Sequence, residues 1–530
     1  MTDSAAARAA KGSGLVLATL ASAQFLMALD SSVMNVSIAS VAEDLGTTVT
    51  GVQTAITLYT LVMATLMITG GKLGGMFGRK RMFVLGTVIY ACGSLTTSLA
   101  PNLTVLIIGW SGLEGIGAAL IMPAVVALVA GNVPPAGRTA AYGLIAAAAA
   151  MAVAAGPIIG GFVTTSFSWR WVFAGEVVVA AAIVVLSRRI VDAPVEARPK
   201  LDPVGVVLSI LGLAGIVLGF LKSSTWGWVQ PKPDAPTILD LSPVIWLIAG
   251  GTFVLWLLMR WLHREERRGV EPLFPTRLLG NRRLTGGLSL FWVQYFMQAG
   301  VFFTIPLFLS IVLGLSAFET GLRLLPLSLG LLATAVGVPK IWPKAAPRRV
   351  VRVGTLLMLV GTAILIGGLE VGANAAVVSV PLLLIGLGIG AMASQLGAVV
   401  VSSAPESEAP AIGGLQNTVM NLGASMGTAL VGALLIAALS SSLATGIQNN
   451  PDIPASVKQK AEVELQSGGI PFVSDEQLAT ELEKAGVDQQ TTDQIVKENE
   501  KARYTGLRVS LCAVLLVGLL GLFLSGSIPR

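Results

Sequence analysis

The chain reads Gly71-Lys72-Leu73-Gly74-Gly75-Met76-Phe77-Gly78-Arg79-Lys80-Arg81 in the short gap between two long apolar segments, residues 52–72 and 82–100. The stretch holds four cationic side chains and four glycines. Cations beside a membrane span favour the cytoplasmic side, and glycines allow a tight turn and close contact between helices. The stretch therefore predicts a tight, basic, cytoplasmic turn between the second and third helices of a membrane protein.

The composition of the whole chain agrees with that prediction. Of its 530 residues, 54% are hydrophobic and 12% are charged, and the mean hydropathy is +0.78. A soluble protein would carry about twice that charged fraction. Apolar runs of about 18 or more residues recur along the chain, and each can cross a bilayer core of about 30 Å as a helix. We expect an all-α polytopic membrane protein, because the strands of a β-barrel would alternate apolar and polar residues.

Charge, cysteine and histidine content argue against several classes of function. The formal net charge is +6, but the cations cluster in short loops where membrane orientation requires them, so no nucleic-acid partner is expected. Cys92 and Cys512 lie in apolar spans, and the only histidine, His263, lies in a basic loop. These positions speak against a metal or disulfide framework, and no cofactor or metal is expected. The sequence also lacks a G-x-x-x-x-G-K-[ST] loop, which argues against ATP-driven transport.

Fourteen membrane spans are predicted from the apolar runs. They are residues 15–41, 52–72, 82–100, 103–131, 139–163, 171–190, 203–221, 243–262, 285–313, 320–338, 351–369, 375–402, 411–438 and 506–526. An even number of spans places both termini on one side, and the richest basic loops fall on that same side. We expect that side to be the cytoplasm and the protein to lie in the cell (inner) membrane.

An internal repeat divides the predicted spans into two sets. Gly115-Ile116-Gly117-Ala118 matches Gly388-Ile389-Gly390-Ala391, and two further short matches stand in nearly the same register, with offsets of about 268–273 residues. The repeat predicts two six-helix bundles, and two such halves that rock about a midplane site are the plan of alternating-access transport. The predicted division is a cytoplasmic tail (1–14), the first bundle (15–190), two extra central helices with linkers (191–284) and the second bundle (285–530), which carries an extracytoplasmic insert (440–505).

Three acidic residues, Asp30, Glu114 and Glu176, fall inside predicted spans. An ionisable group inside a span is costly and is a functional hypothesis by default. Because burial disfavours the charged form, such a carboxylate can bind and release a proton. Asp30 and Glu114 are expected near mid-span, where they could also neutralise a cationic substrate, whereas Glu176 is expected about one and a half turns from the outer end, where water could reach it. The alternative is a structural hydrogen bond, for Asp30 with Asn35 or a neighbouring helix.

Two other spans carry polar faces that suit a substrate site. Gln294 and Gln298 are four residues apart and share one helix face, and Phe302 adds an aromatic ring to the same span. Asn417 and Asn421 form a second polar face at the same spacing. Amide and aromatic groups together suit amphipathic organic ligands. A lipid-facing role is the alternative for the aromatic residues.

Four motifs resemble those of a major facilitator superfamily transporter, and within it the fourteen-span drug:proton antiporter type. They are the loop Gly71–Arg81, the first-span segment Leu29-Asp30-Ser31-Ser32-Val33 with Asn35, the span-five segment Gly156-Pro157-Ile158-Ile159-Gly160-Gly161, and Trp169-Arg170-Trp171-Val172-Phe173. The resemblance implies the major facilitator fold. It also implies that Gly71, Gly78, Arg79 and Lys80 help gate the inner face, and that Gly156, Pro157, Gly160 and Gly161 seal one face of the protein. Ordinary helix packing is the alternative for the span-five motif.

The chain departs from the family pattern at five positions. Gly75 and Met76 stand where the loop usually has an acid and an arginine, so the charge-linked latch of the family must be looser or made otherwise. Ser111 and Glu114 stand where span four usually has a buried arginine and a glutamine, and Glu176 stands where an asparagine is common. The membrane part has thus lost a buried cation and gained two acids.

The resemblance implies a proton-coupled antiporter that exports amphipathic or cationic organic compounds by alternating access, and not an enzyme. Its expected partners are a small-molecule or lipid substrate, protons and membrane lipids, and a monomer is expected. An exporter of a lipid or metabolite on the same scaffold is the alternative, favoured by the missing span-four arginine. A membrane-embedded enzyme or sensor is a third possibility, but the sequence shows no nucleophile–base pair or metal-ligand spacing.

Overall fold

The computed structural model describes the chain except residues 1, 193–199, 233–234, 343, 404–408, 460, 462–471 and 529–530. The described residues form helices and no β-strand. The α-helices are α1 (Thr2–Asp44), α2 (Val49–Phe77), α3 (Arg79–Ser98), α4 (Leu103–Leu106), α5 (Gly115–Asn132), α6 (Pro135–Ser166), α7 (Arg170–Leu186), α8 (Pro203–Trp226), α9 (Pro243–Arg267), α10 (Arg282–Leu307), α11 (Ala317–Arg323), α12 (Leu325–Ile341), α13 (Pro347–Gly368), α14 (Ser379–Val401), α15 (Ala409–Asn449), α17 (Asp475–Lys484) and α18 (Gln489–Leu524). Two π-helical stretches, Ile107–Glu114 and Phe308–Val312, continue α4 and α10, and short 3-10 turns occupy Ser187–Arg189, Thr276–Gly280, Ala375–Val378 and Ser525–Ser527.

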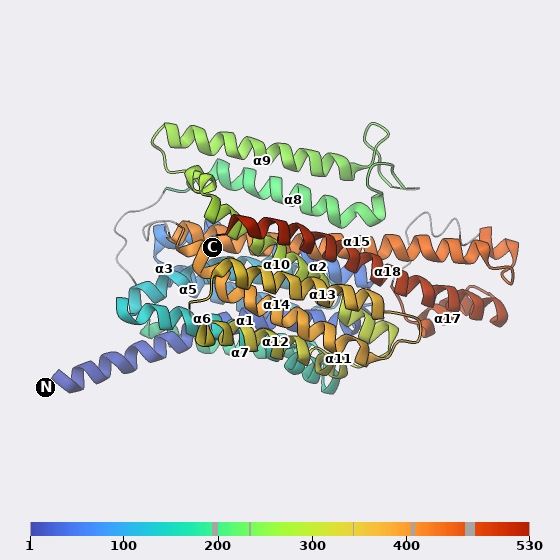
Figure 1. The fold of residues 1–530 in the computed structure, drawn as a ribbon, viewed down its shortest axis with the longest axis horizontal. Coiled ribbons are helices and arrows are strands. Elements are labelled where there is room, and N and C mark those ends of the chain that lie inside the picture. Colours follow the sequence, from blue (N-terminus) through green and yellow to red (C-terminus); the bar gives the residue numbers. More distant parts are fainter. Residues whose placement is uncertain are drawn as a thin grey trace.

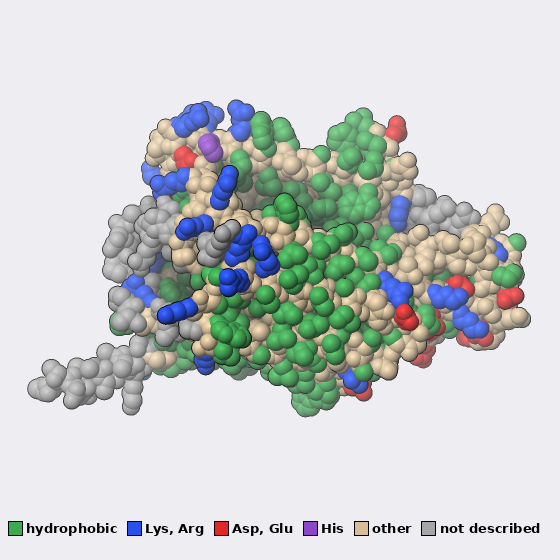
Figure 2. All heavy atoms as spheres, in the orientation of Figure 1, with side chains coloured by type: hydrophobic (Ala, Val, Ile, Leu, Met, Phe, Trp, Pro, Cys, Tyr) green, Lys and Arg blue, Asp and Glu red, His purple; other side chains and the backbone are tan. Residues whose placement is uncertain are grey.

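The long helices run side by side along one axis (Figure 1). Both chain termini lie toward one end, which we call the terminal end, and α17 lies at the opposite end, which we call the insert end (Figure 1). On the face shown in Figure 2, hydrophobic side chains cover the middle, and Lys and Arg gather toward the terminal end. An apolar belt between two polar ends is the surface that a bilayer requires.

The number of spans differs from the expected fourteen. The described residues contain twelve helices that are long and apolar enough to cross a membrane, or thirteen if α11 and α12, bent by 41° at their junction, form one span. The remaining expected span is α3, a helix of 20 residues that packs against α5 and α7. Three cations at its start and several Ser and Thr residues make α3 less apolar than the others. Exactly fourteen spans are therefore not confirmed, although the polytopic all-α fold is.

The helices pack into two groups. In the first group α1 packs on α6, α2 on α5, and α3 on α5 and α7. In the second group α10 packs on α15, α12 and α13 on α14, and α15 on α18. The groups meet where α2 contacts α15 and where α6 contacts α11 and α12, while α8 and α9 pair with each other and attach to α2 and α15 through α8. Figure 1 shows this pair along one side of the molecule.

The two groups are in close contact near the insert end. Gln53 Nε2, in the first turns of α2, donates a hydrogen bond to the Thr428 carbonyl at 2.9 Å. The backbone N–H of Phe318 donates to Thr165 Oγ1, near the end of α6, at 3.0 Å. A Cβ atom at Gly161 would collide with the Ala317 backbone, so α6 and α11 approach as closely as two backbones can. The insert end of the interface is closed in this structure.

The basic turn is shorter than the sequence indicates. Helix α2 continues to Phe77 and α3 begins at Arg79, so the break between them is the single residue Gly78, with φ of +104°. Helix α2 therefore continues to Phe77, beyond residue 72, where the second span is expected to end. The glycines before the break are helical, and Gly71 packs against α5, where it lies beside Pro123.

Candidate functional site

The three acids predicted inside the membrane meet at one point. One carboxylate oxygen from each of Asp30 in α1, Glu114 at the end of the π-helical stretch and Glu176 in α7 lies within 4.8 Å of the other two. Asp30 and Glu114 are 0% exposed and Glu176 is 2% exposed. We call these three residues the acid cluster.

Each carboxyl group of the acid cluster has one oxygen bound by the protein and one oxygen left free. Asp30 Oδ1 accepts from Trp110 Nε1 at 2.8 Å, Glu114 Oε1 accepts from Thr97 at 3.1 Å, and Glu176 Oε2 accepts from Tyr90 and Ser94, both at 3.1 Å. The second oxygens, Asp30 Oδ2, Glu114 Oε2 and Glu176 Oε1, are buried without a hydrogen-bond partner. Because a buried polar atom without a partner is unfavourable, each of these second oxygens favours a bound proton or a hydrogen-bond donor.

Local backbone features place Glu114 in the cluster. The π-helical stretch Ile107–Glu114 lengthens each hydrogen-bonded turn by one residue, a distortion that is frequent at functional sites. Gly93 in α3 faces it, and a Cβ there would lie 2.5 Å from Glu114 Cγ and 2.7 Å from the Gly109 carbonyl oxygen. Glycine at position 93 therefore leaves the space that the Glu114 side chain fills.

Two aromatic rings border the cluster on its α2 side, and the sequence reasoning missed both. Tyr59 stacks on Trp110 with ring centroids 4.8 Å apart and an angle of 7° between the rings. Trp110 donates to Asp30, and the Tyr59 hydroxyl is buried without a hydrogen-bond partner. Buried Tyr and Trp side chains usually satisfy their polar atoms, but nothing in a single sequence distinguishes such rings from the lipid-facing aromatic residues of other spans.

No ion pair with a described Lys, Arg or His neutralises the acid cluster. At a separation of 4.8 Å, two ionised carboxylates repel by about 3.5 kcal/mol at an effective dielectric constant of about 20. Three ionised groups would accumulate about 10 kcal/mol of repulsion, so the cluster must share protons or hold a cation. Oxygen ligands at these separations also suit a single hard cation.

Two details of the expectations for these acids are wrong. Glu176 does not reach water, because Tyr90 and Ser94 of α3 cover its carboxyl group. Asn35 does not pair with Asp30; it donates to the Ser31 carbonyl at 2.7 Å. The structural alternative for Asp30 is thus a bond to Trp110 on a neighbouring helix.

Besides Asp30 and Glu114, which belong to the acid cluster, the predicted substrate residues lie in the second group of helices. Gln294 is buried, with Nε2 3.5 Å from the Ile389 carbonyl oxygen and Oε1 without a partner. Phe302 is buried and Gln298 is half-buried on the same helix, α10. Asn417 and Asn421 are half-buried in α15 and donate to backbone carbonyls one turn earlier. Among the described residues, no hydrogen bond links any of these five side chains to the acid cluster, so their role as a substrate site stays a prediction.

The span-five motif packs α6 against two other helices. A Cβ at Gly156 would meet Ser32, and one at Gly160 would meet Val33, so these glycines hold α6 tightly against α1 beside Asp30. Gly161 faces α11 as described above, and the Pro157 carbonyl lies against Gly321 of the same helix. The motif therefore joins the helix that carries Asp30 to the interface between the two groups.

The basic turn contacts the first group of helices. Arg79 Nη1 lies 3.4 Å from the Ala127 carbonyl oxygen in α5, and Lys80 Nζ lies 3.3 Å from the Arg188 carbonyl oxygen. Asp192 accepts from the Lys80 backbone N–H at 3.2 Å, so an acid does reach the turn, although Gly75 replaces the usual one. Lys72 pairs with Glu271 in the segment after α9 at 3.5 Å.

Comparison with known proteins agrees with this fold. The Major Facilitator Superfamily model matches residues 20–428. The tetracenomycin C resistance and export protein of Streptomyces glaucescens is 31% identical over 77% of this chain and 73% of its own length. The puromycin resistance protein pur8 of Streptomyces alboniger is 30% identical over 81% of this chain and 83% of its own length.

Solved structures show the same architecture. A bacterial homologue of the human lysosomal transporter Spinster, in an inward-facing and unoccupied conformation, superimposes with a TM-score of 0.60 at 14% identity and with 98% of each chain covered. A POT family transporter in complex with a thioalcohol-conjugated peptide gives a TM-score of 0.59 at 14% identity, covering 98% of this chain and 97% of its own. With a family model that covers most of its length and a bundle of apolar helices, the chain belongs to the major facilitator superfamily and is a multi-pass membrane transporter, not an enzyme.

Proposed function

We propose that this protein is a proton-coupled antiporter that exports amphipathic or cationic organic compounds by alternating access. The acid cluster carries the protons, and the polar faces of α10 and α15 contribute to the substrate site. The single observation that carries the proposal is the meeting of Asp30, Glu114 and Glu176 in the protein interior, where each carboxyl group keeps one oxygen without a hydrogen-bond partner. Proton binding and release by such a cluster changes its charge, and a change of buried charge can be coupled to movement of helices.

The class of substrate rests on the relatives. The curated relatives include proteins for export of, or resistance to, tetracenomycin C and puromycin, which are organic compounds. A multidrug resistance protein of Mycobacterium tuberculosis is also 25% identical over 84% of this chain. Buried and half-buried amide groups at Gln294, Gln298 and Asn421 suit compounds of mixed polarity. Export of a lipid or a metabolite remains an outcome of the experiment below.

The contacts between the two groups at the insert end support an inward-facing conformation in the proposed cycle. In the proposed orientation the basic terminal end faces the cytoplasm, and the two halves, residues 15–190 and 285–530, rock against each other. The contacts of α2 with α15 and of α6 with α11 are then the outer gate, held shut in this structure. Substrate enters from the inner side, and protonation of the acid cluster from outside resets the carrier.

Everted membrane vesicles test the proposal. Ethidium, a cationic amphipathic dye, or puromycin should dissipate a preformed proton gradient in vesicles that contain the protein, and Asp30→Asn and Glu114→Gln should each reduce this response at least tenfold. Glu483→Gln is the matched control, because Glu483 is an exposed acid of α17 far from the cluster. Unchanged proton coupling in both cluster variants would exclude the carboxylate mechanism. A lipid exporter would respond to lipid analogues and to neither compound.

A further inference from the structure

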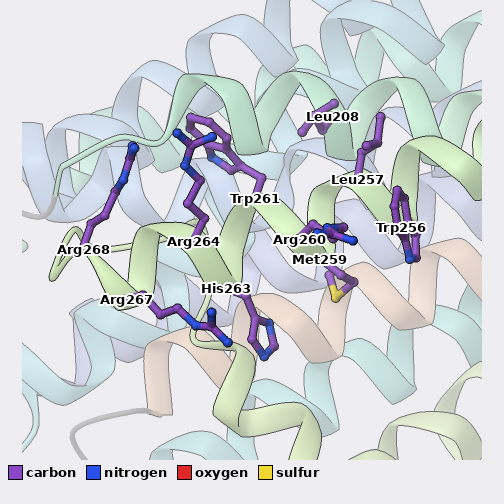
Figure 3. A pocket seen from close by; sticks show the side chains of 10 residues that line it. All are labelled: Leu208, Trp256, Leu257, Met259, Arg260, Trp261, His263, Arg264, Arg267 and Arg268. Carbon is purple, nitrogen blue, oxygen red and sulfur yellow. The ribbon is translucent and has the colours of Figure 1, made fainter.

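The last turns of α9 border a hollow of about 900 Å³ that the transport mechanism does not use. Its lining on α9 includes Trp256, Arg260, His263, Arg264 and Arg267, and Leu208 of α8 adds to its wall. Figure 3 shows these side chains projecting from successive turns of α9, with Arg267 and His263 extending toward the same side. The hollow lies at the terminal end of the molecule, where α9 ends.

The spacing of these residues places them on one stripe of the helix. Arg260, His263, Arg264 and Arg267 follow one another at intervals of three and four, and Trp256 precedes Arg260 by four residues. Residues at this spacing are neighbours on a helix surface. Arg260 lies over the Trp256 ring at 5.0 Å from its centroid. The stripe therefore places three arginine residues along one side of α9, and Arg260 lies over an aromatic ring, while Figure 3 shows the Arg264 and Arg267 side chains extending in different directions.

The acids next to this stripe are engaged elsewhere. Glu265 pairs with Arg268 at 3.5 Å, Glu266 accepts from the Thr276 backbone N–H at 2.5 Å, and Glu271 pairs with Lys72 at 3.5 Å. No described carboxylate forms an ion pair with Arg260, Arg264 or Arg267. Like charges one helical turn apart repel each other. A bound anion would reduce the repulsion among Arg260, Arg264 and Arg267.

The position of the stripe indicates where that anion comes from. Only 17% of the most apolar part of α9 is buried inside the protein, and the exposed Phe253 and Trp256 lie on the bilayer side of the arginines. An apolar helix face that leads into a Trp residue and then into arginines matches the order of acyl chain, interface and headgroup in one leaflet. Arginine forks suit the oxygens of a phosphate ester.

We propose that the α9 stripe is a binding site for an anionic phospholipid of the leaflet at the terminal end. The headgroup phosphate lies between Arg260, Arg264 and Arg267, and the acyl chains lie along the apolar face of α8 and α9. The bound lipid fills the hollow along α9, whose lining residues lie on α8, on α9 and at the end of α9. The site thus attaches α9 to the bilayer at the end opposite the closed gate.

Native mass spectrometry of the purified full-length protein tests this site. The protein is equilibrated in mixed micelles with equal amounts of phosphatidylglycerol and phosphatidylcholine of identical acyl chains. The wild-type protein should retain phosphatidylglycerol with a preference of about tenfold or more, and Arg264→Gln/Arg267→Gln should lose that preference. The control variant Lys344→Gln/Arg349→Gln removes two exposed cations at the same end but outside the stripe, and it should keep the preference for phosphatidylglycerol. The variant Arg264→Lys/Arg267→Lys keeps the charge and should show part of the wild-type preference for phosphatidylglycerol.

Three results would overturn the site. They are equal retention of the two lipids by the wild-type protein, full retention by the Arg264→Gln/Arg267→Gln variant, and equal loss in the control variant. Inorganic phosphate added to the same micelles distinguishes the two sources of a phosphate group. Displacement of phosphatidylglycerol by millimolar phosphate would show that the site binds the free anion. A site for the lipid should retain phosphatidylglycerol when phosphate is added.

Discussion

Replacing Glu114 by Gln changes the charge of the acid cluster without changing its shape. The bond from Thr97 to Oε1 can remain, because the Gln side chain keeps one carbonyl oxygen at that place. The change removes two of the three pairwise repulsions among oxygens that lie within 4.8 Å of one another. At about 3.5 kcal/mol for each pair, the fully ionised cluster becomes less unfavourable by about 7 kcal/mol, a factor of about 10⁵ in its population. The variant thus has one fewer group that can exchange a proton. Asp30 and Glu176, which remain, repel each other less than three ionised groups do, so protonation of the cluster is favoured less strongly.

We expect the number of protons exchanged for each substrate molecule to fall by one in Glu114→Gln. The measurement uses proteoliposomes with ethidium, in which the proton gradient and the membrane potential are set independently. The condition at which net ethidium flux reverses gives the ratio of protons to substrate. Thermal unfolding in detergent should change little, within about 1 kcal/mol, because the substitution is nearly isosteric. Glu483→Gln should behave as wild type in both measurements.

An unchanged ratio of protons to substrate in Glu114→Gln, in protein that unfolds like the wild type, would refute this reasoning. It would mean that the Glu114 carboxyl keeps one protonation state through the cycle. Glu114 would then be a structural hydrogen-bond acceptor for Thr97, and the repulsion argument would apply to Asp30 and Glu176 alone.

Two further predictions concern packing and capping. Gly93→Ala should destabilise the protein by about 1–3 kcal/mol in thermal unfolding, because the new Cβ lies 2.5 Å from Glu114 Cγ. Gly143→Ala is the control and should not destabilise the protein, because nothing lies within 4 Å of a Cβ at that position. Equal effects of the two substitutions would contradict the packing account. At the start of α18, the backbone N–H of Thr491 donates to Asp488 and lowers the pKa of that carboxyl group. A lowered pKa stabilises the helix start above about pH 4 and loses this effect as the pH falls below that value. The protection factor of the Thr491 amide, which removes the intrinsic pH dependence of hydrogen exchange, should therefore fall on acidification in wild type but not in Asp488→Ala, and equal pH dependence of this factor in both would disprove the cap.

The fold was predictable because it depends on the hydropathy of successive segments, which follows directly from the sequence. Apolar runs predicted the polytopic bundle, and the motif at Asp30 and the Gly156–Gly161 segment predicted the superfamily. The number of spans was harder, because α3 carries three cations at its start and polar residues along one face. The break after α2 comes later than the glycines suggest, because Gly71, Gly74 and Gly75 are helical and Gly71 packs against Pro123 of α5.

The residues of the candidate site could be predicted from the sequence, but their proximity in the folded protein could not. Each buried acid stood out alone, since a charged group in an apolar run is conspicuous. Their meeting depends on how α1, α7 and the π-helical stretch cross, and a π-helix has no signature in one sequence. Glu176 was placed near water because distance along a span says nothing about which neighbouring helix covers a side chain. Tyr59 and Trp110 were missed for the related reason that aromatic residues are common in every span.

Proton release from the purified protein is the most direct test of the central claim that the acid cluster exchanges protons for substrate. The measurement adds ethidium to wild-type protein in weakly buffered detergent solution with a pH indicator. We predict the release of about one or more protons for each protein molecule, and no release from the Asp30→Asn/Glu114→Gln/Glu176→Gln variant, with binding of ethidium checked by its fluorescence. Equal proton release from the wild type and the triple variant would contradict the account.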